Sequence, residues 1–240
     1  QERENKSLLT RFGKIGCDIL KKWQEAQGIK HQPPLSSGPI QLGIVSAHFS
    51  SHPVWHAITK GLLLNLDPKL FEVHLFDLGK SADSETVIAR KHCTSYTQDK
   101  KSLADWAQSI VDQNIEALLF PEIGMDPLTR ELASLRLAPV QMASWGHPET
   151  TGLATIDYFI SGEDLEPNNA DENYSEKLIK LPNLGCFFES SGVTPSTLAV
   201  EDLGLSRDQP ILLCAGSPSK YSPQNDSVLV EIAKRLGKCQ

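Results

Sequence analysis

The stretch Gly43-Ile-Val-Ser-Ala-His-Phe-Ser-Ser-His-Pro-Val-Trp-His56 passes directly from an apolar run into the start of a helix. The run 40–45 is typical of a short buried strand. Pro53 suits the first turn of a helix, which the spacing of apolar residues extends to Leu66. A strand followed at once by a helix is the repeating unit of a parallel sheet, so this stretch predicts an α/β fold.

The same alternation continues along the rest of the chain. Apolar runs predict strands at 71–78, 115–120, 140–144, 158–161, 178–181 and 211–214. Helical patterns fall between them at 103–112, 127–137 and 223–236. We therefore expect a Rossmann-like parallel sheet with helices on both faces.

The residues before this sheet predict a separate helix and a linker. Between residues 7 and 23, five apolar residues share one helical face: Leu8, Phe12, Ile15, Ile19 and Trp23. Pro, Ser and Gly then dominate 31–39, which predicts a linker. We assign 1–30 to the end of a helical, repeat-type region and 40–195 to the first Rossmann-like domain. Residues 196–240 would begin a second such domain, which we expect to be truncated. The chain starts at Gln1 and stops in a helix-forming run, so we expect both of its ends to be cuts.

Composition excludes several classes of protein. The 240 residues carry a net charge of −7 and contain no basic stripe, which argues against nucleic acid as a partner. No apolar run approaches the roughly 20 residues of a membrane span. The five cysteines are widely spaced without a Cys-x-x-Cys pair, so neither a zinc site nor a disulfide framework is indicated. We expect a cytoplasmic protein with reduced thiols and no bound metal.

Several familiar catalytic signatures are absent. No strand is followed by Gly-x-Gly-x-x-Gly, and no P-loop occurs, so the usual dinucleotide and nucleoside triphosphate sites are not indicated. The sequence also lacks the Gly-x-Ser-x-Gly elbow of α/β-hydrolases and the His-Glu-x-x-His of zinc proteases.

In parallel sheets, ligands bind at the carboxyl ends of the strands, which here are the loops 46–52, 121–126, 145–152 and 215–220. His52 could contact a phosphate or an acceptor hydroxyl, or it could only cap the helix that follows. The glycines of 145–152 allow a ligand close to the backbone, or they form a rigid turn. Lys220 is well placed to neutralise a diphosphate, although a solvated surface lysine is the simpler interpretation.

Six segments in one order resemble a known family. They are Ile-Val-Ser-Ala-His-Phe…His-Pro at 44–53, Leu-Arg-Leu-Ala-Pro-Val-Gln at 135–141, Trp-Gly-His-Pro-x-Thr-x-Gly at 145–152, Ile-Asp-Tyr-Phe-Ile at 156–160, Tyr-Ser-Glu-Lys-Leu-Ile-Lys-Leu-Pro at 174–182, and Lys220-x-x-Pro223. Over residues 41–235 the chain is similar to the glycosyltransferases that include animal O-GlcNAc transferase, plant SPINDLY and their bacterial relatives. Its motifs are most similar to those of the bacterial SPINDLY-like branch.

This resemblance implies a GT-B fold of two Rossmann-like halves, with the active site in the cleft between them. It implies an inverting, metal-independent transfer from a UDP-sugar, with UDP-GlcNAc expected, to Ser or Thr of protein or peptide acceptors, without a cofactor. Helical repeats precede the catalytic region in the family. Matching positions give His52 and Lys220 as catalytic residues. The matching donor and acceptor loop consists of Gly146, His147, Pro148, Thr150, Thr151 and Gly152.

Three positions depart from the animal enzymes. Glu116 replaces a histidine, His147 replaces a tyrosine, and Ser217 replaces a glutamine. These departures leave the sugar open and motivate an alternative, a non-catalytic scaffold of the same fold. A glycosyltransferase acting on a lipid or glycan is a third hypothesis. Because the second half is incomplete, we expect this segment alone to bind nucleotide poorly and to be inactive.

Overall fold

A computed structural model of the chain describes residues 5–31, 37–100, 102–188, 194–217 and 221–240. The chain divides into two compact units, Gln1–Glu189 and Ser190–Gln240. The first unit contains a sheet of seven strands, and the second contains the helix α6 (Asp226–Leu236). Among the described residues, no helix is both long and apolar enough to span a lipid bilayer.

The seven strands form one parallel sheet in the order β3-β2-β1-β4-β5-β6-β7. Their bounds are β1 Ile40–Ser46, β2 Phe71–Asp77, β3 Ser95–Thr97, β4 Ala117–Phe120, β5 Val140–Ser144, β6 Tyr158–Gly162 and β7 Lys177–Leu181. The strand order runs outward in both directions from the neighbours β1 and β4. The direction in which successive strands are added to the sheet therefore reverses between these two strands, at what we call the reversal point. In open α/β sheets, this reversal point is where ligands bind, beyond the carboxyl ends of the strands.

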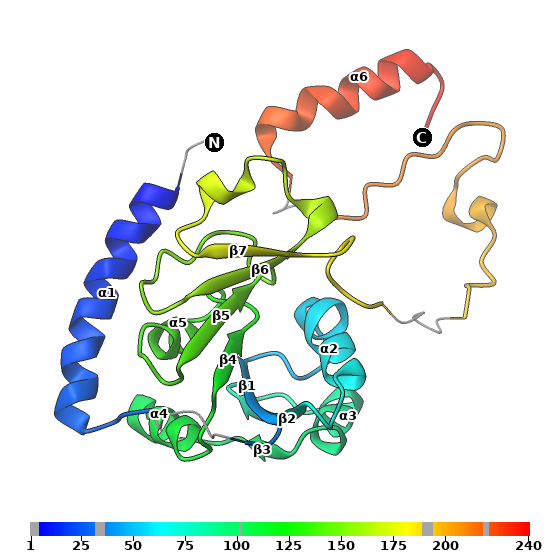
Figure 1. The fold of residues 1–240 in the computed structure, drawn as a ribbon. Helices are drawn as coiled ribbons and strands as arrows, with labels where there is room; N and C mark the ends of the chain where they lie inside the picture. Colours follow the sequence, from blue (N-terminus) through cyan, green and yellow to red (C-terminus); the bar gives the residue numbers. More distant parts are fainter. Residues whose placement is uncertain (1–4, 32–36, 101, 189–193, 218–220) are drawn as a thin grey trace. The chain divides into compact units, whose positions relative to one another are not determined.

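Helices cover both faces of the sheet, as Figure 1 shows. One face carries α1 (Lys6–Gln27), α4 (Leu103–Val111) and α5 (Pro127–Ala133), and the other carries α2 (Lys60–Asn65) and α3 (Ser84–Lys91). Side chains alternate along each strand accordingly. In β4, Leu118 and Phe120 join the core under α4 and α5, while Leu119 joins the core on the opposite face. The resulting three layers confirm the predicted α/β class.

The helix predicted at 53–66 differs from expectation in its first turns. Residues Trp55–Thr59 form a π-helix, and a regular α-helix begins only at Lys60. The Thr59 hydroxyl donates a hydrogen bond to the Val54 carbonyl five residues earlier, in keeping with the wider turn. The extra residue rotates the buried face, so Trp55, Thr59 and Leu63 are buried, whereas the predicted positions after Val54 are only half-buried.

Helix α1 belongs to the same compact unit as the sheet. Its described start and its end at Gly28, which has a left-handed φ of 70°, agree with the predicted helix. The helix packs through Gly13, Cys17 and Gln24. The apolar stripe of Leu8, Phe12, Ile15 and Ile19 is 60–64% exposed, although Arg130 of α5 lies over the Phe12 ring, 4.7 Å from its centroid. The docked face therefore combines small and polar residues, which allow close backbone approach, with Leu20 and Trp23, which pack against the core.

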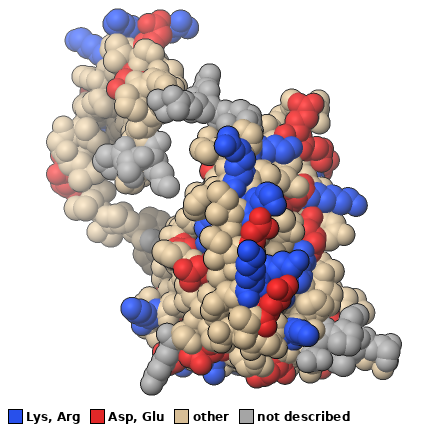
Figure 2. Space-filling view, turned by 90° about the vertical axis from the view of Figure 1, so that its left-hand side faces the viewer, with Lys and Arg blue, Asp and Glu red and all other residues tan. Residues whose placement is uncertain are grey.

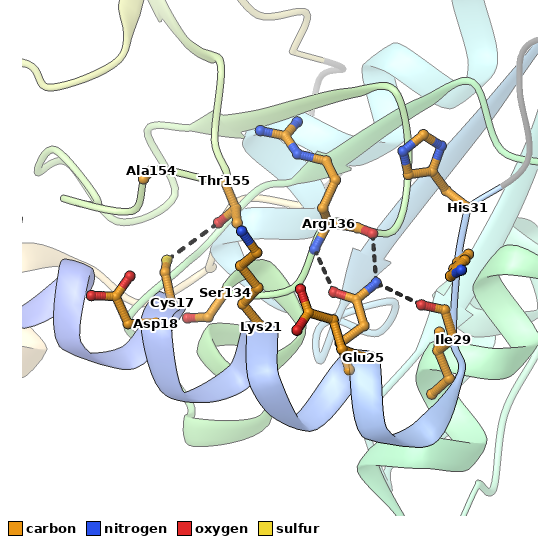
Figure 3. A pocket seen from close by; sticks show the side chains of 12 residues that line it. Cys17, Asp18, Lys21, Glu25, Ile29, His31, Ser134, Arg136, Ala154 and Thr155 are labelled. Atoms are coloured by element: carbon orange, nitrogen blue, oxygen red, sulfur yellow. Dashed lines mark hydrogen bonds between the residues drawn. The ribbon is translucent and has the colours of Figure 1, made fainter.

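The Gln24 side chain fixes the carboxyl end of α1. Its amide donates to the carbonyls of Ile29 (3.1 Å) and Arg136 (2.8 Å) and accepts from the Arg136 N–H (3.1 Å). Together with a contact between Cys17 and Thr155, these bonds join α1 to the loops on either side of β5, as Figure 3 shows. The groove beside them has a volume of about 570 Å³.

The second unit departs from the prediction in one element. No strand forms at 211–214, and Leu213 is 85% exposed. A strand needs a neighbour to satisfy its backbone, and the described part of this unit contains no other strand. Instead, the Leu212 N–H donates to the Gln240 carbonyl, and the Gln240 N–H donates to the Pro210 carbonyl. The helix predicted at 223–236 is present as a short 3₁₀ turn, Pro223–Asn225, followed by α6.

Candidate functional site

Three loops meet at the reversal point of the sheet, at the carboxyl ends of β1, β4 and β5. The loop after β1 carries His48 and His52, the loop after β4 carries Glu122 and Asp126, and the loop after β5 carries His147. Gly146 N–H donates to the Pro121 carbonyl at 3.0 Å, which joins the second and third loops. The topology thus gathers titratable side chains from distant parts of the sequence at the place where a ligand is expected.

The two histidines of the first loop are stacked on each other. Their ring centroids are 3.7 Å apart, and the planes differ by 8°. Burial lowers the pKa of His48, and the neighbouring His52 lowers it further, against the opposing effect of Asp126. Burial likewise lowers the pKa of His52, and the nearby His56 adds to the effect. Both rings are therefore held in the neutral form, which can donate one hydrogen bond and accept another.

The hydrogen bonding of His52 assigns its tautomer. Its Nδ1 accepts a hydrogen bond of 3.2 Å from the Val54 N–H, at the start of the helix. A nitrogen that accepts carries no proton, so the proton of the neutral ring lies on Nε2. His52 therefore caps the helix, as the simpler sequence interpretation held. Its remaining nitrogen still offers a hydrogen bond to an acceptor atom.

Glu122 lies at the centre of the three loops and is fully buried. Its Oε1 accepts from the Ser46 hydroxyl (2.7 Å) and the Ala47 N–H (2.8 Å), whereas Oε2 is buried without a hydrogen-bond partner in the described structure. Burial raises the pKa of Glu122 to about 7, assisted by the negative charges of Asp126 and Asp77 and opposed by the bonds from Ser46 and Ala47. The carboxyl group is thus poised between its two protonation states near neutral pH.

The predicted residues of the loop 145–152 fall into two groups. Gly146 and His147 lie at the junction of the three loops. A Cβ on Gly146 would come within 2.5 Å of the Pro121 carbonyl oxygen, and the His147 ring packs on Gly124. The exposed Pro148 borders a shallow groove beside the first turn of α1. Only the first part of this segment therefore lies at the reversal point.

The second group, Thr150, Thr151 and Gly152, is buried between α1 and β7. The carboxylate of Glu176 accepts hydrogen bonds from both threonine hydroxyls and from the Thr151 N–H. Gly152 has a φ of 68° and lies directly against Leu9 of α1. These residues hold the loop in place in this structure, and their predicted contact with substrate is untested.

Lys220 and Glu116 come from other segments of the sequence. Lys220 lies outside the described residues. Glu116, one of the departures that suggested a scaffold, precedes the first residue of β4 and accepts a hydrogen bond of 3.0 Å from the Gln41 N–H. It is therefore at the amino end of the strand, opposite to the end that leads to Glu122. The substitution at position 116 leaves the cluster at the reversal point intact.

The sequence profile of glycosyl transferase family 41 matches residues 6–190. The chain belongs to glycosyl transferase family 41. Over 82% of its length it is 25% identical to a probable UDP-N-acetylglucosamine–peptide N-acetylglucosaminyltransferase, SEC, of Arabidopsis thaliana. It is 26% identical, again over 82% of its length, to a UDP-glucose:protein N-β-glucosyltransferase of Actinobacillus pleuropneumoniae. The matches cover 21% and 30% of those two proteins, so this family 41 chain spans under a third of either relative.

A solved structure also resembles this family 41 chain. It is a lysine-to-methionine mutant of the O-GlcNAc transferase of Thermobaculum terrenum, matched with a TM-score of 0.72 at 19% identity. The match covers 93% of this chain and 43% of the transferase. The likeness confirms the predicted GT-B type of α/β fold for this family 41 member. Among its described residues, no group of three His, Cys, Asp or Glu side chains is arranged to hold a metal ion.

Proposed function

We propose that the full-length protein is an inverting, metal-independent glycosyltransferase that transfers a sugar, GlcNAc in the first instance, from UDP to Ser or Thr of proteins. The observation that carries the proposal is that His48, His52, His147 and Glu122 lie in the three loops that meet at the reversal point of a family 41 sheet. The names of the relatives supply the substrate classes, a UDP-sugar and a protein or peptide.

The chemistry that such a site must perform is a single displacement. The acceptor hydroxyl forms a bond to the anomeric carbon, the bond from that carbon to the diphosphate oxygen breaks, and the hydroxyl proton passes to solvent. Negative charge grows on the departing UDP, where fixed positive or hydrogen-bond-donating groups are most effective. We assign this stabilisation to Lys220. We assign His52 the role of a hydrogen-bond donor through Nε2, because its Nδ1 is already engaged with Val54.

The donor sugar is the finer part of the proposal. One relative is named for N-acetylglucosamine and the other for glucose, at nearly equal identity to this chain. Radiolabelled UDP-GlcNAc and UDP-glucose should therefore be compared with the same protein acceptors. We expect transfer of label from UDP-GlcNAc in the presence of a metal chelator.

The residue roles can be tested in the full-length protein by His52→Ala and Lys220→Ala. We expect each variant to lose transfer by about 10²–10³-fold, the usual effect of removing one donor to a developing charge. His92→Ala is the matched control, since His92 is exposed at the end of α3. Wild-type rates in both variants would refute the assigned roles. Calorimetry with UDP tests the alternative of a non-catalytic scaffold, which predicts no saturable binding.

A further inference from the structure

Glu122 is the most deeply buried ionisable group at the reversal point, and the roles assigned above do not use it. It has no exposed surface, and its Oε2 has no hydrogen-bond partner in the described structure. An ionised carboxylate with an unsatisfied buried oxygen is strongly disfavoured, whereas a neutral acid is much less so. Because Oε1 already accepts two hydrogen bonds, the proton of the neutral acid belongs on Oε2.

A short chain of hydrogen bonds leads from Glu122 to the stacked histidines. The Ser46 hydroxyl donates to Glu122 Oε1, and the same hydroxyl accepts from the backbone N–H of His48 at 3.0 Å. The Ala47 N–H supplies the second bond to Oε1. Glu122 therefore fixes the backbone turn after β1, and this turn places the His48 ring against the His52 ring.

The charged surroundings of Glu122 act against its ionisation. Asp77 at the end of β2 and Asp126 ahead of α5 both oppose a further negative charge. The first loop also carries His48 and His52, and burial lowers the pKa of both, so neither supplies a lasting positive charge. His147 of the third loop packs on Gly124, in the loop that carries Glu122.

We propose that Glu122 is a positioning residue, which holds the turn bearing His48 and His52 in its working geometry only while its carboxyl group is protonated. Loss of the proton places a negative charge among three packed loops. The bonds from Ser46 and Ala47 stabilise this charge at Oε1 only. Oε2 then needs a donor that the described structure does not supply, and gaining one displaces the packing around the turn. The proposal predicts that transfer falls as the pH rises above neutrality. The activity measurement rests on the function proposed above, whereas the measurement of thermal unfolding does not depend on catalysis.

The decisive variant is Glu122→Gln in the full-length protein. A glutamine keeps an oxygen for Ser46 and Ala47 but cannot ionise. We expect wild-type transfer to fall about tenfold per pH unit above a pH of about 7, as for loss of one essential proton, and this fall to be absent in the variant. Ser46→Ala removes a donor that lowers the pKa of Glu122, so the fall should move to higher pH. An alkaline fall of equal position in all three proteins would overturn the proposal.

Thermal unfolding supplies the readout that needs no activity. The pKa of Glu122 is raised in the folded state, so the folded protein binds the extra proton between the ordinary glutamate pKa and about 7. Wild-type stability relative to Glu122→Gln should therefore decline as pH rises through that interval and level off above it. A constant difference across pH indicates a purely structural residue and overturns the proposal, even if the protein proves not to be a transferase.

Glu116→Gln is the control for both measurements. It makes the same change just before β4 rather than just after it, and Glu116 accepts its hydrogen bond from the Gln41 N–H. We expect its unfolding temperature to follow the wild type in parallel at every pH. A pH-dependent divergence like that of Glu122→Gln would show that the effect belongs to any glutamate beside this strand, and it would defeat the assignment.

Discussion

Gly13 marks the closest approach between α1 and the loop after β5. A Cβ at this position would lie 2.0 Å from the carbonyl oxygen of Gly152, and all of its nearest neighbours are backbone atoms, which cannot rotate aside. Replacing Gly13 with alanine must therefore displace the helix or the loop, and overpacking of this kind costs about 1–3 kcal/mol. We expect Gly13→Ala to lower the free energy of unfolding by that amount in urea titrations.

Gly16, one turn further along α1, is the matched control for this prediction. A Cβ there would meet only the Ser134 hydroxyl, at 3.9 Å. Alanine has the higher helix propensity, so Gly16→Ala should leave stability unchanged or raise it by up to about 1 kcal/mol. Equal losses for the two variants would mean that the helix itself, rather than its contact with Gly152, responds to the added methyl group.

At the scale of single residues, the sequence identified where the candidate site lies better than which side chains it uses. The post-strand loops 46–52, 121–126 and 145–152 do meet, because parallel strands end at one edge of a sheet. Glu122 was not singled out within its loop. Its burial depends on Gly146 and Ser46, which approach it from other strands, and no local pattern reports that.

Among the elements, the strands were the most predictable part. The strands expected at 140–144 and 71–78 agree with β5 and β2 to within one residue, since buried apolar runs are unambiguous in an alternating α/β pattern. The half-buried β3 has only three residues and gave no such run. Helix α3 was also missed, although Asp83 and Thr86 form a capping box at its start.

The apolar stripe of α1 provides a test at the scale of this element. Ile15 and Ile19 are 60% and 61% exposed, so Ile15→Gln and Ile19→Gln should change the stability of the 240-residue chain by no more than about 0.5 kcal/mol. Leu132 in α5 is fully buried, and Leu132→Ala should cost about 2–5 kcal/mol. Chemical denaturation of the three variants measures both effects. A large loss for either isoleucine variant would show that the stripe is covered.

Considered as a whole, the first unit presents a surface of mixed charge beside α1. Lys14 and Asp18 form an ion pair of 3.1 Å along the exposed side of the helix. Figure 2 shows Lys and Arg side chains interspersed with Asp and Glu on this face. Exposed pairs of this kind contribute little to stability, so the attachment of α1 depends on its inner face.

That attachment predicts the behaviour of a shorter chain. A chain beginning at residue 39 lacks Gln24, which bonds to the backbone of Arg136, and Gly13, which meets Gly152. The loop 150–155 then loses its cover and exposes buried residues such as Leu153. We expect this chain to unfold at a temperature several degrees lower than the chain of 240 residues, as measured by circular dichroism. Equal melting temperatures would contradict the prediction.

The contact between α1 and the sheet also bears on how the protein should be cut for expression. The stretch rich in proline and serine before β1 is the natural place to begin a cloned segment, and it is the boundary that composition suggests. A cut there would separate a helix from the domain that it completes. The segment expressed for crystallisation or enzymology should instead start upstream of Lys6, so that it contains both the first helix and the sheet.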